Sequence, residues 1–324
     1  MNRIDALAAP LLVSWQLTRD CDLACLHCCT DSAPNKHLPD ELTGSEALRL
    51  AGQIVAAGVP YVMLCGGEPL RVAHFMTIAE ALGAAGVHLK IETNGQLFDD
   101  TIADRLSRLP IRSIQISLDG DTQEAYARQR PGASLARVHA ACRAVRAAGM
   151  PLEVTFAPTR HNIHEIEAVI DRARALGAFR FNTGRLMRVG RAARLWPKLA
   201  PTPEDYAQFR RTLDRHAGAS RRLDMEFCYH PFRAGDGLRQ SIESPPATLL
   251  ILPDGRVKMA GILPFVCADV RQMELTQAWR NYCAAWRNPA IIAATHRALA
   301  DEAEHAVPMT GRKFTETALQ GAIG

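Results

Sequence analysis

Cys21-Asp22-Leu23-Ala24-Cys25-Leu26-His27-Cys28 places three thiols within eight residues, at the spacing Cys-x-x-x-Cys-x-x-Cys. The stretch follows an apolar run and is therefore predicted to be a loop at the end of a strand. Three thiolates in one short loop leave the fourth position of a four-sulfur site open. A structural zinc site requires four closed ligands, whereas a reactive metal centre needs a free position for its substrate. Zinc binding and three buried core cysteines remain the alternatives for this stretch alone.

Length and composition predict an ordinary globular protein. The chain has 324 residues, 48% hydrophobic and 22% charged, which suffices for one large core or a barrel with an appendage. Residues 1–10 contain no long apolar stretch, and no later segment approaches eighteen consecutive apolar residues. We therefore expect a cytoplasmic protein with no membrane partner. The odd count of nine cysteines favours reduced thiols over disulfides, and a net charge of +4 is too small to indicate nucleic acid.

Short apolar runs alternate with amphipathic ones, which predicts repeated strand-helix units and a parallel sheet. Six strands are expected at 11–18, 61–64, 87–92, 114–118, 152–156 and 179–182. Thr43-Gly44-Ser45-Glu46 predicts a capping box at the start of a helix that runs through Ala57. Further helices are expected at 73–82, 100–109, 134–148 and 163–176. Polar, glycine-containing motifs follow the strands, which is where an α/β barrel assembles its active site.

Gly66-Gly67-Glu68-Pro69 follows the second predicted strand. Glycines let the backbone approach a ligand closely, and a carboxylate can pair with an ammonium group. A tight turn with one incidental acid is the alternative. After the fourth predicted strand, Ser117 offers a hydroxyl for a ribose and Arg128 a planar guanidinium for a carboxylate. A helix-capping turn beside a solvated arginine is the alternative there.

Taken in order, these motifs resemble those of the radical S-adenosylmethionine (radical SAM) superfamily over about residues 11–192. The resemblance implies a partial (β/α)6 TIM-like barrel and two cofactors, one 4Fe-4S cluster and S-adenosylmethionine (SAM). Cys21, Cys25 and Cys28 are then the catalytic and metal-binding residues, and the iron that they leave free chelates the methionine moiety of SAM.

The same resemblance assigns roles around SAM. The Gly66, Gly67 and Glu68 motif binds the amino group, Ser117 reaches the ribose, and Arg128 contacts the carboxylate. We prefer Arg128 to Arg130 because of its distance to the following glycine. The resemblance places three more residues at the mouth of the barrel, where SAM would bind. Two are the polar residues Thr93 and Asn94, and the third is Leu186, as an apolar wall against adenine. An ordinary core leucine is the alternative for Leu186.

The pattern changes beyond Ala193, so we divide the chain into a barrel at 1–192 and an extension at 193–324. Helices are expected at 204–216, 275–286 and 290–299, and a hairpin at 248–259. The extension resembles the SPASM or Twitch extensions of peptide-modifying radical SAM enzymes, but the hairpin lacks their auxiliary-cluster cysteines. Cys228, Cys267 and Cys283 are widely spaced and are interpreted as packing residues, so one cluster is predicted.

The resemblance implies hydrogen abstraction from a ribosomally made peptide by a 5'-deoxyadenosyl radical. A small metabolite such as a tetrapyrrole or sugar is the alternative, and an iron-sulfur binding module without SAM cleavage is a third hypothesis. Expected partners are the substrate, a reductant such as flavodoxin or ferredoxin, and a separate leader-peptide-binding protein. The arginines after strand six fit acidic partners or a solvated surface, and they lack the interleaved aromatics of a single-stranded nucleic-acid platform. Tyr229 and His230 are weaker candidates to face the substrate.

Overall fold

The computed structural model describes residues 4–219, 225–229, 234–296 and 317–318. The contacts divide the chain into two compact units. The first comprises Met1–Arg19, His37–Leu89 and Ala234–Gly324, and the second comprises Asp20–Lys36 and Lys90–Arg233. Each unit therefore joins segments that are far apart in the sequence. The division into 1–192 and 193–324 stays a prediction.

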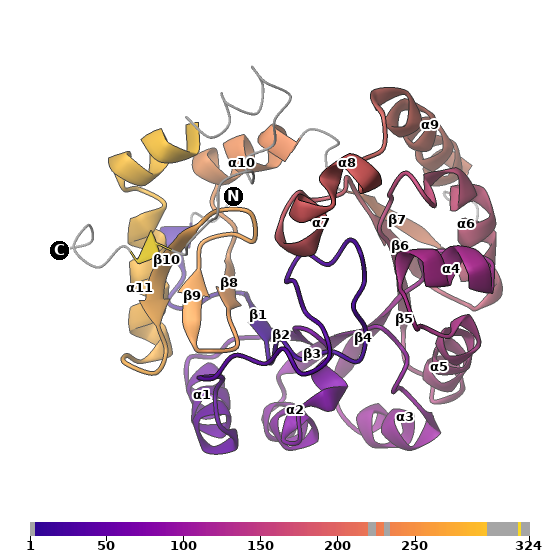
Figure 1. The fold of residues 1–324 in the computed structure, drawn as a ribbon. Coiled ribbons are helices and arrows are strands. Elements are labelled where there is room, and N and C mark those ends of the chain that lie inside the picture. Colours follow the sequence, from indigo (N-terminus) through magenta and orange to yellow (C-terminus); the bar gives the residue numbers. More distant parts are fainter. Residues whose placement is uncertain (1–3, 220–224, 230–233, 297–316, 319–324) are drawn as a thin grey trace. The chain divides into compact units, whose positions relative to one another are not determined.

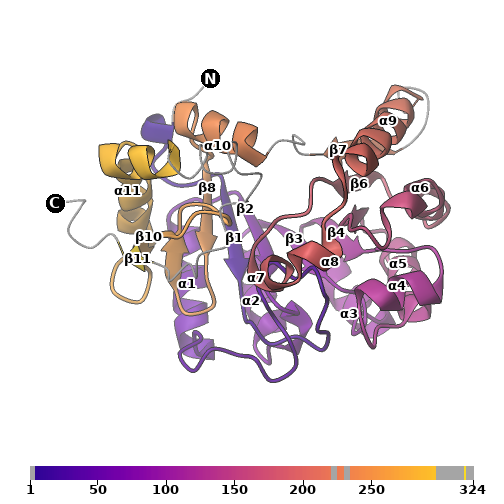
Figure 2. The same cartoon turned by 45° about the horizontal axis from the view of Figure 1, so that its top comes forward.

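The strands of the first unit run in the order β11-β10-β9-β8-β1-β2. Strand β1 is parallel to both β2 and β8, whereas β9 is antiparallel to β8 and β10. Figures 1 and 2 show β8 beside β1, although about 230 residues separate them in the chain. Their bounds are β1 Leu12–Gln16, β2 Tyr61–Cys65, β8 Thr248–Ile251, β9 Arg256–Lys258, β10 Phe265–Asp269 and β11 Thr317–Ala318.

The first unit's helices include the one that the capping box predicted. The Thr43 side chain accepts from the backbone of Glu46, and the Glu46 side chain accepts from the backbone of Thr43, which confirms the box. Residues 289–296 are also helical, and the end of the helix expected at 290–299 lies outside the described residues. The bounds are η1 Ile4–Ala6, α1 Gly44–Ala56, η2 Pro69–Arg71, α2 Phe75–Ala84, α10 Ala234–Glu243 and α11 Leu275–Ala285.

The second unit contains four consecutive parallel strands, β4 to β7. Apolar residues at alternate positions, such as Ile116, Val154 and Phe181, are fully buried. Helix α5 packs against β4 and β5, as βα units require for a sheet buried on its helical face. The bounds are β4 Ile111–Ser117, β5 Leu152–Phe156, β6 Arg180–Thr183 and β7 Glu226–Tyr229, and β3 His88–Thr93 runs from the first unit into the second.

The second unit's helices complete the α/β pattern, and the α/β class is confirmed. All six predicted strands form, each within three residues of its expected ends, whereas β7, β10, α4, α7, α8 and α10 were not predicted. No helix in the described part of the chain is long and apolar enough to cross a membrane. The bounds are α3 Asp100–Ser107, α4 Gln123–Gln129, α5 Leu135–Ala147, η3 Ile163–Glu165, α6 Ile166–Ala175, α7 Gly190–Arg194, α8 Trp196–Leu199 and α9 Pro203–Ala219.

Candidate active site around the cysteine loop

The three cysteine sulfurs lie in the second unit, in the loop that follows β1, and each is contacted by hydrogen-bond donors. Cys21 Sγ accepts from the backbone N–H of Leu23 at 3.4 Å, and Cys25 Sγ accepts from Arg130 Nη1 at 3.5 Å. Cys28 Sγ accepts from the backbone N–H of Ser32 at 3.2 Å. Donors to sulfur stabilise the thiolate form, which is the form that ligates iron. At Cys25 burial has the larger effect and raises the pKa of the thiol, so the donors only partly offset the cost of a buried thiolate.

The relative placement of these thiols bears on the kind of metal centre. Within the described residues, no three Cys, His, Asp or Glu side chains converge as the ligands of one metal ion would. A zinc ion needs ligands around a single point, whereas the thiolates of an iron-sulfur cube each bind a different iron. Three thiolates are the donor set that an iron-sulfur cube with one open iron would use.

Asp119 and Arg130 form a buried ion pair next to Cys25. Arg130 Nε donates to Asp119 Oδ2 at 2.7 Å, and the Asp119 side chain is completely buried. His27 Nε2 lies 3.2 Å from the same carboxylate oxygen. Burial lowers the pKa of His27 to about 4 although Asp119 opposes the shift, so the imidazole is neutral at neutral pH. The pair thus places one fixed positive charge beside the Cys25 thiol.

The structure places Arg128 away from this network. The Arg128 side chain is 54% exposed and pairs with Glu124 one turn earlier in α4. Arg130, which we ranked second in the sequence, is the arginine that reaches the cysteine loop. Helix α4 ends at Gln129, and Arg130 follows it with a non-helical backbone (φ -125°, ψ 78°), so its side chain leaves the helix in another direction from that of Arg128. A role of Arg128 toward SAM stays a prediction.

Asn94 joins the turn after β3 to the cysteine loop. Its Nδ2 atom donates to Asp22 Oδ1 at 2.7 Å and lies 3.7 Å from Cys21 Sγ. The turn holds this side chain firmly, because Asn94 Oδ1 accepts from the backbone of Gln96 and Thr93 Oγ1 accepts from Gly95. The buried Thr93 is therefore part of the turn itself, whereas Asn94 contacts the cysteines' own loop.

Ser117 and Asn162 lie at the ends of neighbouring strands. Ser117 ends β4, is half-buried, and its carbonyl oxygen accepts from Tyr126 Oη at 3.3 Å. Asn162 is completely buried and donates to the carbonyl oxygens of Asp119 and Ala157. Asn162 therefore fixes the loops after β4 and β5 to one another, which is a structural role.

The segment between β6 and α7 is fastened to the cysteine loop. The backbone N–H of Arg191 donates to the carbonyl oxygen of Cys28 at 2.9 Å, and its guanidinium donates to those of Cys25 and Ser32, both at 2.7 Å. Gly190 has φ +58°, and a Cβ there would lie 2.4 Å from the carbonyl oxygen of Cys29. Only glycine fits such a close approach. In the sequence, Arg191 is distinguished only as one member of the basic run after strand six.

Leu186 belongs to a small apolar cluster in the same segment. It is 7% exposed and packs with Ala192 and Leu199, and Leu26 of the cysteine loop packs against the cluster. Leu186 therefore helps to anchor the loop, as the core-leucine alternative predicts. A contact with adenine stays a prediction.

The Gly66, Gly67 and Glu68 motif lies in the first unit, directly after β2. Gly66 has φ +138°, and a Cβ there would lie 2.7 Å from the carbonyl oxygen of Thr18. The backbone N–H of Gly67 donates to that same oxygen at 2.6 Å. The Glu68 carboxylate is buried and accepts from Leu70 at the start of η2. The glycines are thus required by the backbone, and the role of Glu68 toward an ammonium group stays a prediction.

Polar side chains of β3 to β6 form a second network, which sequence reasoning missed. Lys90 Nζ donates to Gln115 Oε1 and Glu153 Oε2, both at 2.9 Å, and Asn182 donates to the same two oxygens. Burial raises the pKa of Glu92 on the same strand as Lys90. The sequence does contain a signal for this network, because polar residues occupy every second position of these strands. Such alternation marks the side chains that share one face of a sheet.

The remaining cysteines have packing environments or lie on the surface. Cys65, Cys142, Cys267 and Cys283 are buried, and Cys29 and Cys228 are exposed. Cys267 donates to the carbonyl oxygen of Val257, and burial raises the pKa of its thiol to about 12. Such a thiol is protonated and suits packing. The number of clusters in the protein stays a prediction.

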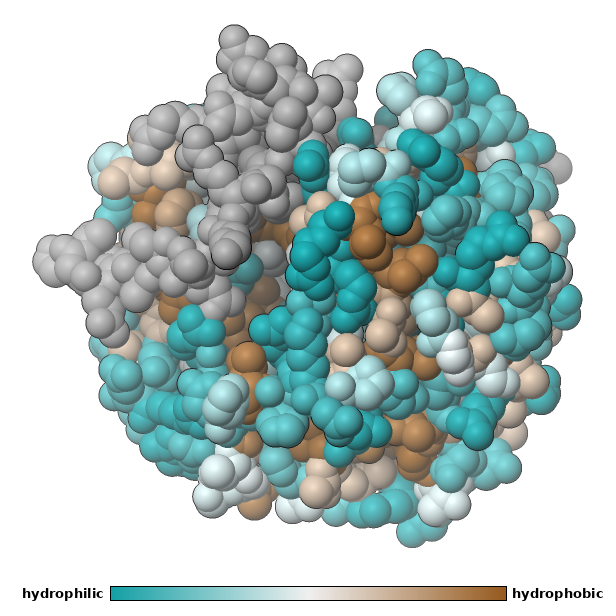
Figure 3. Space-filling view, in the orientation of Figure 1, coloured by the Kyte–Doolittle hydropathy of each residue, from teal (hydrophilic) through white to brown (hydrophobic). Residues whose placement is uncertain are grey.

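The basic residues after β6 divide into fixed and solvated ones. Figure 3 shows hydrophilic surface over α9, where Arg210 pairs with Asp214 and Arg215 with Glu167. These arginines match the solvated-surface alternative. Arg221, Arg222 and His230 lie outside the described residues, and Tyr229 donates to Asp214.

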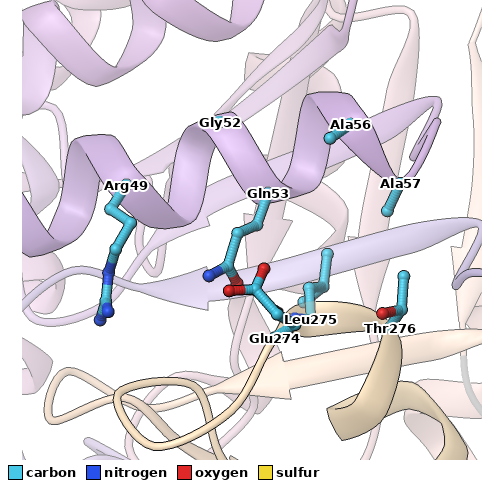
Figure 4. Close-up of a pocket in the computed structure, with 8 residues that line it drawn as sticks. All are labelled: Arg49, Gly52, Gln53, Ala56, Ala57, Glu274, Leu275 and Thr276. Atoms are coloured by element: carbon cyan, nitrogen blue, oxygen red, sulfur yellow. Dashed lines mark hydrogen bonds between the residues drawn. The ribbon is translucent and has the colours of Figure 1, made fainter.

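A separate shallow pocket lies in the first unit between α1 and the start of α11 (Figure 4). Arg49 and Gln53 extend from α1, and Glu274 and Leu275 come from the α11 start. Gln53 Oε1 accepts from the backbone N–H of Leu275 at 3.0 Å. This contact joins the two helices, and the pocket contains no cysteine or histidine.

Comparison with known proteins places these observations in a family. Residues 15–173 match the sequence model of the Radical SAM superfamily. An AdoMet-dependent heme synthase of Methanosarcina barkeri is 26% identical over 297 residues, which cover 84% of this chain and 83% of the relative. The mycofactocin maturase MftC of Mycobacterium ulcerans is 33% identical over 197 residues, covering 60% of this chain and 53% of the relative. This chain thus spans about half the length of that maturase.

A solved structure shows the same fold. Streptococcus suis SuiB bound to its precursor peptide SuiA gives a TM-score of 0.70 at 16% identity, covering 90% of this chain and 68% of SuiB. At this identity the likeness concerns the fold alone. It confirms the expected partial-barrel class, whose sheet is not closed.

Proposed function

This chain belongs to the radical SAM superfamily, and we propose that it abstracts a hydrogen atom from a ribosomally made peptide. It is an enzyme of radical chemistry that uses a 4Fe-4S cluster and SAM. Cys21, Cys25 and Cys28 would hold the cluster. When bound, the cluster supplies the electron that converts SAM to a 5'-deoxyadenosyl radical. The observation that carries this assignment is the set of donors on all three sulfurs.

The protein's own residues shape and shield the site. Arg130 and Asn94 orient the loop through Cys25, Cys21 and Asp22. The apolar contact of Leu26 with the Leu186 cluster covers one side of the loop and limits access of water. Such shielding protects a carbon radical from quenching by solvent. Glu68 is proposed to bind the SAM amino group, Ser117 the ribose and Arg128 the carboxylate.

The peptide proposal is supported by the likeness to MftC, which is named as a maturase, and to SuiB, which was solved with a precursor peptide. A reductant such as flavodoxin or ferredoxin would supply the electron, and a separate protein would present the leader peptide. A tetrapyrrole with carboxylate side chains is the second candidate. It is favoured by one observation, namely that the match to the heme synthase extends over 84% of this chain and the match to MftC over 60%.

The test is anaerobic reconstitution with iron and sulfide, followed by measurement of 5'-deoxyadenosine formed from SAM with a chemical reductant. We expect formation by the wild type and none by Cys28→Ala, with Cys142→Ala as the control because Cys142 is buried in α5. Deuterium transfer into deoxyadenosine is then measured with two substrates, a deuterated precursor peptide and a porphyrin deuterated on its propionate side chains. The substrate that transfers deuterium identifies the substrate class. Undiminished deoxyadenosine formation by Cys28→Ala would refute the assignment of the cluster.

A further inference from the structure

Arg188 lies in the loop between β6 and α7, three residues before Arg191 and close to the cysteine loop. Gly190 abuts the carbonyl oxygens of Cys28 and Cys29, and Arg191 donates to three carbonyl oxygens of the cysteine loop. Two residues of extended chain span at most about 7 Å, so the Arg188 Cα lies within about 11 Å of the Cys28 carbonyl oxygen. The backbone of Arg188 is therefore held near the cysteine loop.

Other arginines around the cysteine loop already have partners. Arg130 pairs with Asp119, and Arg194 pairs with Asp31. Arg191 is occupied by the carbonyl oxygens of the loop. These three guanidinium groups thus serve the protein's own structure and are not available for a ligand.

Arg188 differs from them. Its guanidinium lies over the Trp196 ring at 5.4 Å from the centroid, and its buried Nε has no hydrogen-bond partner among the residues that the structure describes. Burial lowers the pKa of Arg188, and the ion pairs of the described part include none from this residue. The buried Nε is out of reach of a ligand, so an anion would be bound by the two Nη groups of this half-buried guanidinium, which has no ion pair within the described residues.

We propose that Arg188, supported by the ring of Trp196, binds a carboxylate of the substrate at the edge of the cluster site. A guanidinium offers two parallel donors that match a carboxylate, and stacking on an aromatic ring fixes its plane. The carboxylate belongs either to an acidic peptide residue or to a tetrapyrrole propionate. This inference rests on the proposed function and narrows its substrate to carboxylate-bearing molecules.

The experiment measures binding to the reconstituted enzyme without reductant. The probes are coproporphyrin, which carries four propionates, and an acidic peptide, each beside its neutral counterpart, the tetramethyl ester or the Glu→Gln peptide. We expect the wild type to prefer at least one carboxylate probe over its neutral counterpart by tenfold or more. Which probe shows the preference identifies the source of the carboxylate.

Arg188→Gln should abolish that preference and leave binding of the neutral counterpart unchanged, whereas Arg188→Lys should retain part of it. Arg210→Gln is the matched control, because it removes a surface charge of α9 that pairs with Asp214. Equal binding of charged and neutral probes by the wild type would overturn the proposal. So would a preference that survives in Arg188→Gln.

Two parallel measurements separate this inference from its premise. SAM affinity is measured in the same variants, and a loss in Arg188→Gln would assign the residue to the SAM carboxylate and overturn the substrate proposal. Deoxyadenosine formation without substrate tests the proposed function alone. A wild type that binds carboxylates through Arg188 but does not cleave SAM would refute the function and leave the Arg188 site standing.

Discussion

Arg130 places its Nη1 atom 3.5 Å from the Sγ atom of Cys25, while its Nε atom pairs with the buried Asp119. Asp119 also accepts from the backbone of Ala157 and faces His27. One arginine thereby connects the loop after β4 with the cysteine loop. Its charge compensates a carboxylate that water cannot reach, and it adds a donor to the Cys25 sulfur.

Replacement of Arg130 by Gln should therefore destabilise the apoprotein strongly, by about 3–5 kcal/mol, because Asp119 would stay buried without its partner. Arg128→Gln is the matched control, two residues earlier near the end of α4, and should cost about 0.3–0.5 kcal/mol, since Arg128 makes an exposed pair with Glu124. Urea unfolding of both variants measures the difference. Similar unfolding midpoints for the two variants would contradict the assigned roles.

Gly190→Ala should displace the cysteine loop. The new methyl group would lie 2.4 Å from the carbonyl oxygen of Cys29, at a backbone φ of +58°. Overpacking and left-handed strain each cost on the order of 1–3 kcal/mol. We expect less iron bound per chain after reconstitution and faster loss of iron to a chelator.

Gly218→Ala provides the control for this variant, because a Cβ at Gly218 meets no atom within 4 Å and the position lies in helix α9. It should bind iron as the wild type does and be slightly more stable, by about 0.5–1 kcal/mol. Wild-type iron retention by Gly190→Ala would show that the α7 segment does not hold the loop.

The sequence predicted the six central strands because each is a short apolar run followed by a turn motif. It did not predict β7, because Glu226–Tyr229 offers only four residues, of which none is fully buried. The spacing of the three cysteines located the cysteine loop, but it did not reveal the residues that hold this loop in place. Arg191 and Gly190 lie some 160 residues away, and only the fold shows that they contact Cys25 and Cys28. The ranking of Arg128 over Arg130 relied on spacing, which does not reveal that α4 ends between these two residues.

Asn94→Ala should lower the reduction potential of the reconstituted cluster. Asn94 Nδ2 lies 3.7 Å from Cys21 Sγ and donates to Asp22, and a donor near a cluster sulfur stabilises the reduced, more negative state. Asn281→Ala, a change at a half-buried position of α11 that removes contacts with Gln277 and Met273, is the control. A redox titration followed by electron paramagnetic resonance measures both. An unchanged potential in Asn94→Ala, with full iron content, would argue against this role.

The capping box of α1 gives the first unit a defined dependence on pH. Hydrogen bonds from Thr43, and then the Arg271 guanidinium, lower the pKa of Glu46 to about 2 from its usual value near 4.5. Because the folded-state pKa is depressed, the stabilisation is complete above about pH 4.5 and is lost as the pH falls toward 2. Glu46→Gln removes the titrating group and keeps the side-chain length.

The difference in urea midpoint between wild type and Glu46→Gln should therefore be largest above pH 5 and shrink steadily from pH 4.5 to pH 3. Glu124→Gln is the control, because Glu124 forms an exposed pair with Arg128 and belongs to the second unit. Its midpoint should differ little from wild type across the range. If the difference in urea midpoint between wild type and Glu46→Gln stayed constant between pH 5 and pH 3, protonation of Glu46 would leave the N-terminus of α1 unaffected. The carboxylate would then not be held by Thr43 and Arg271.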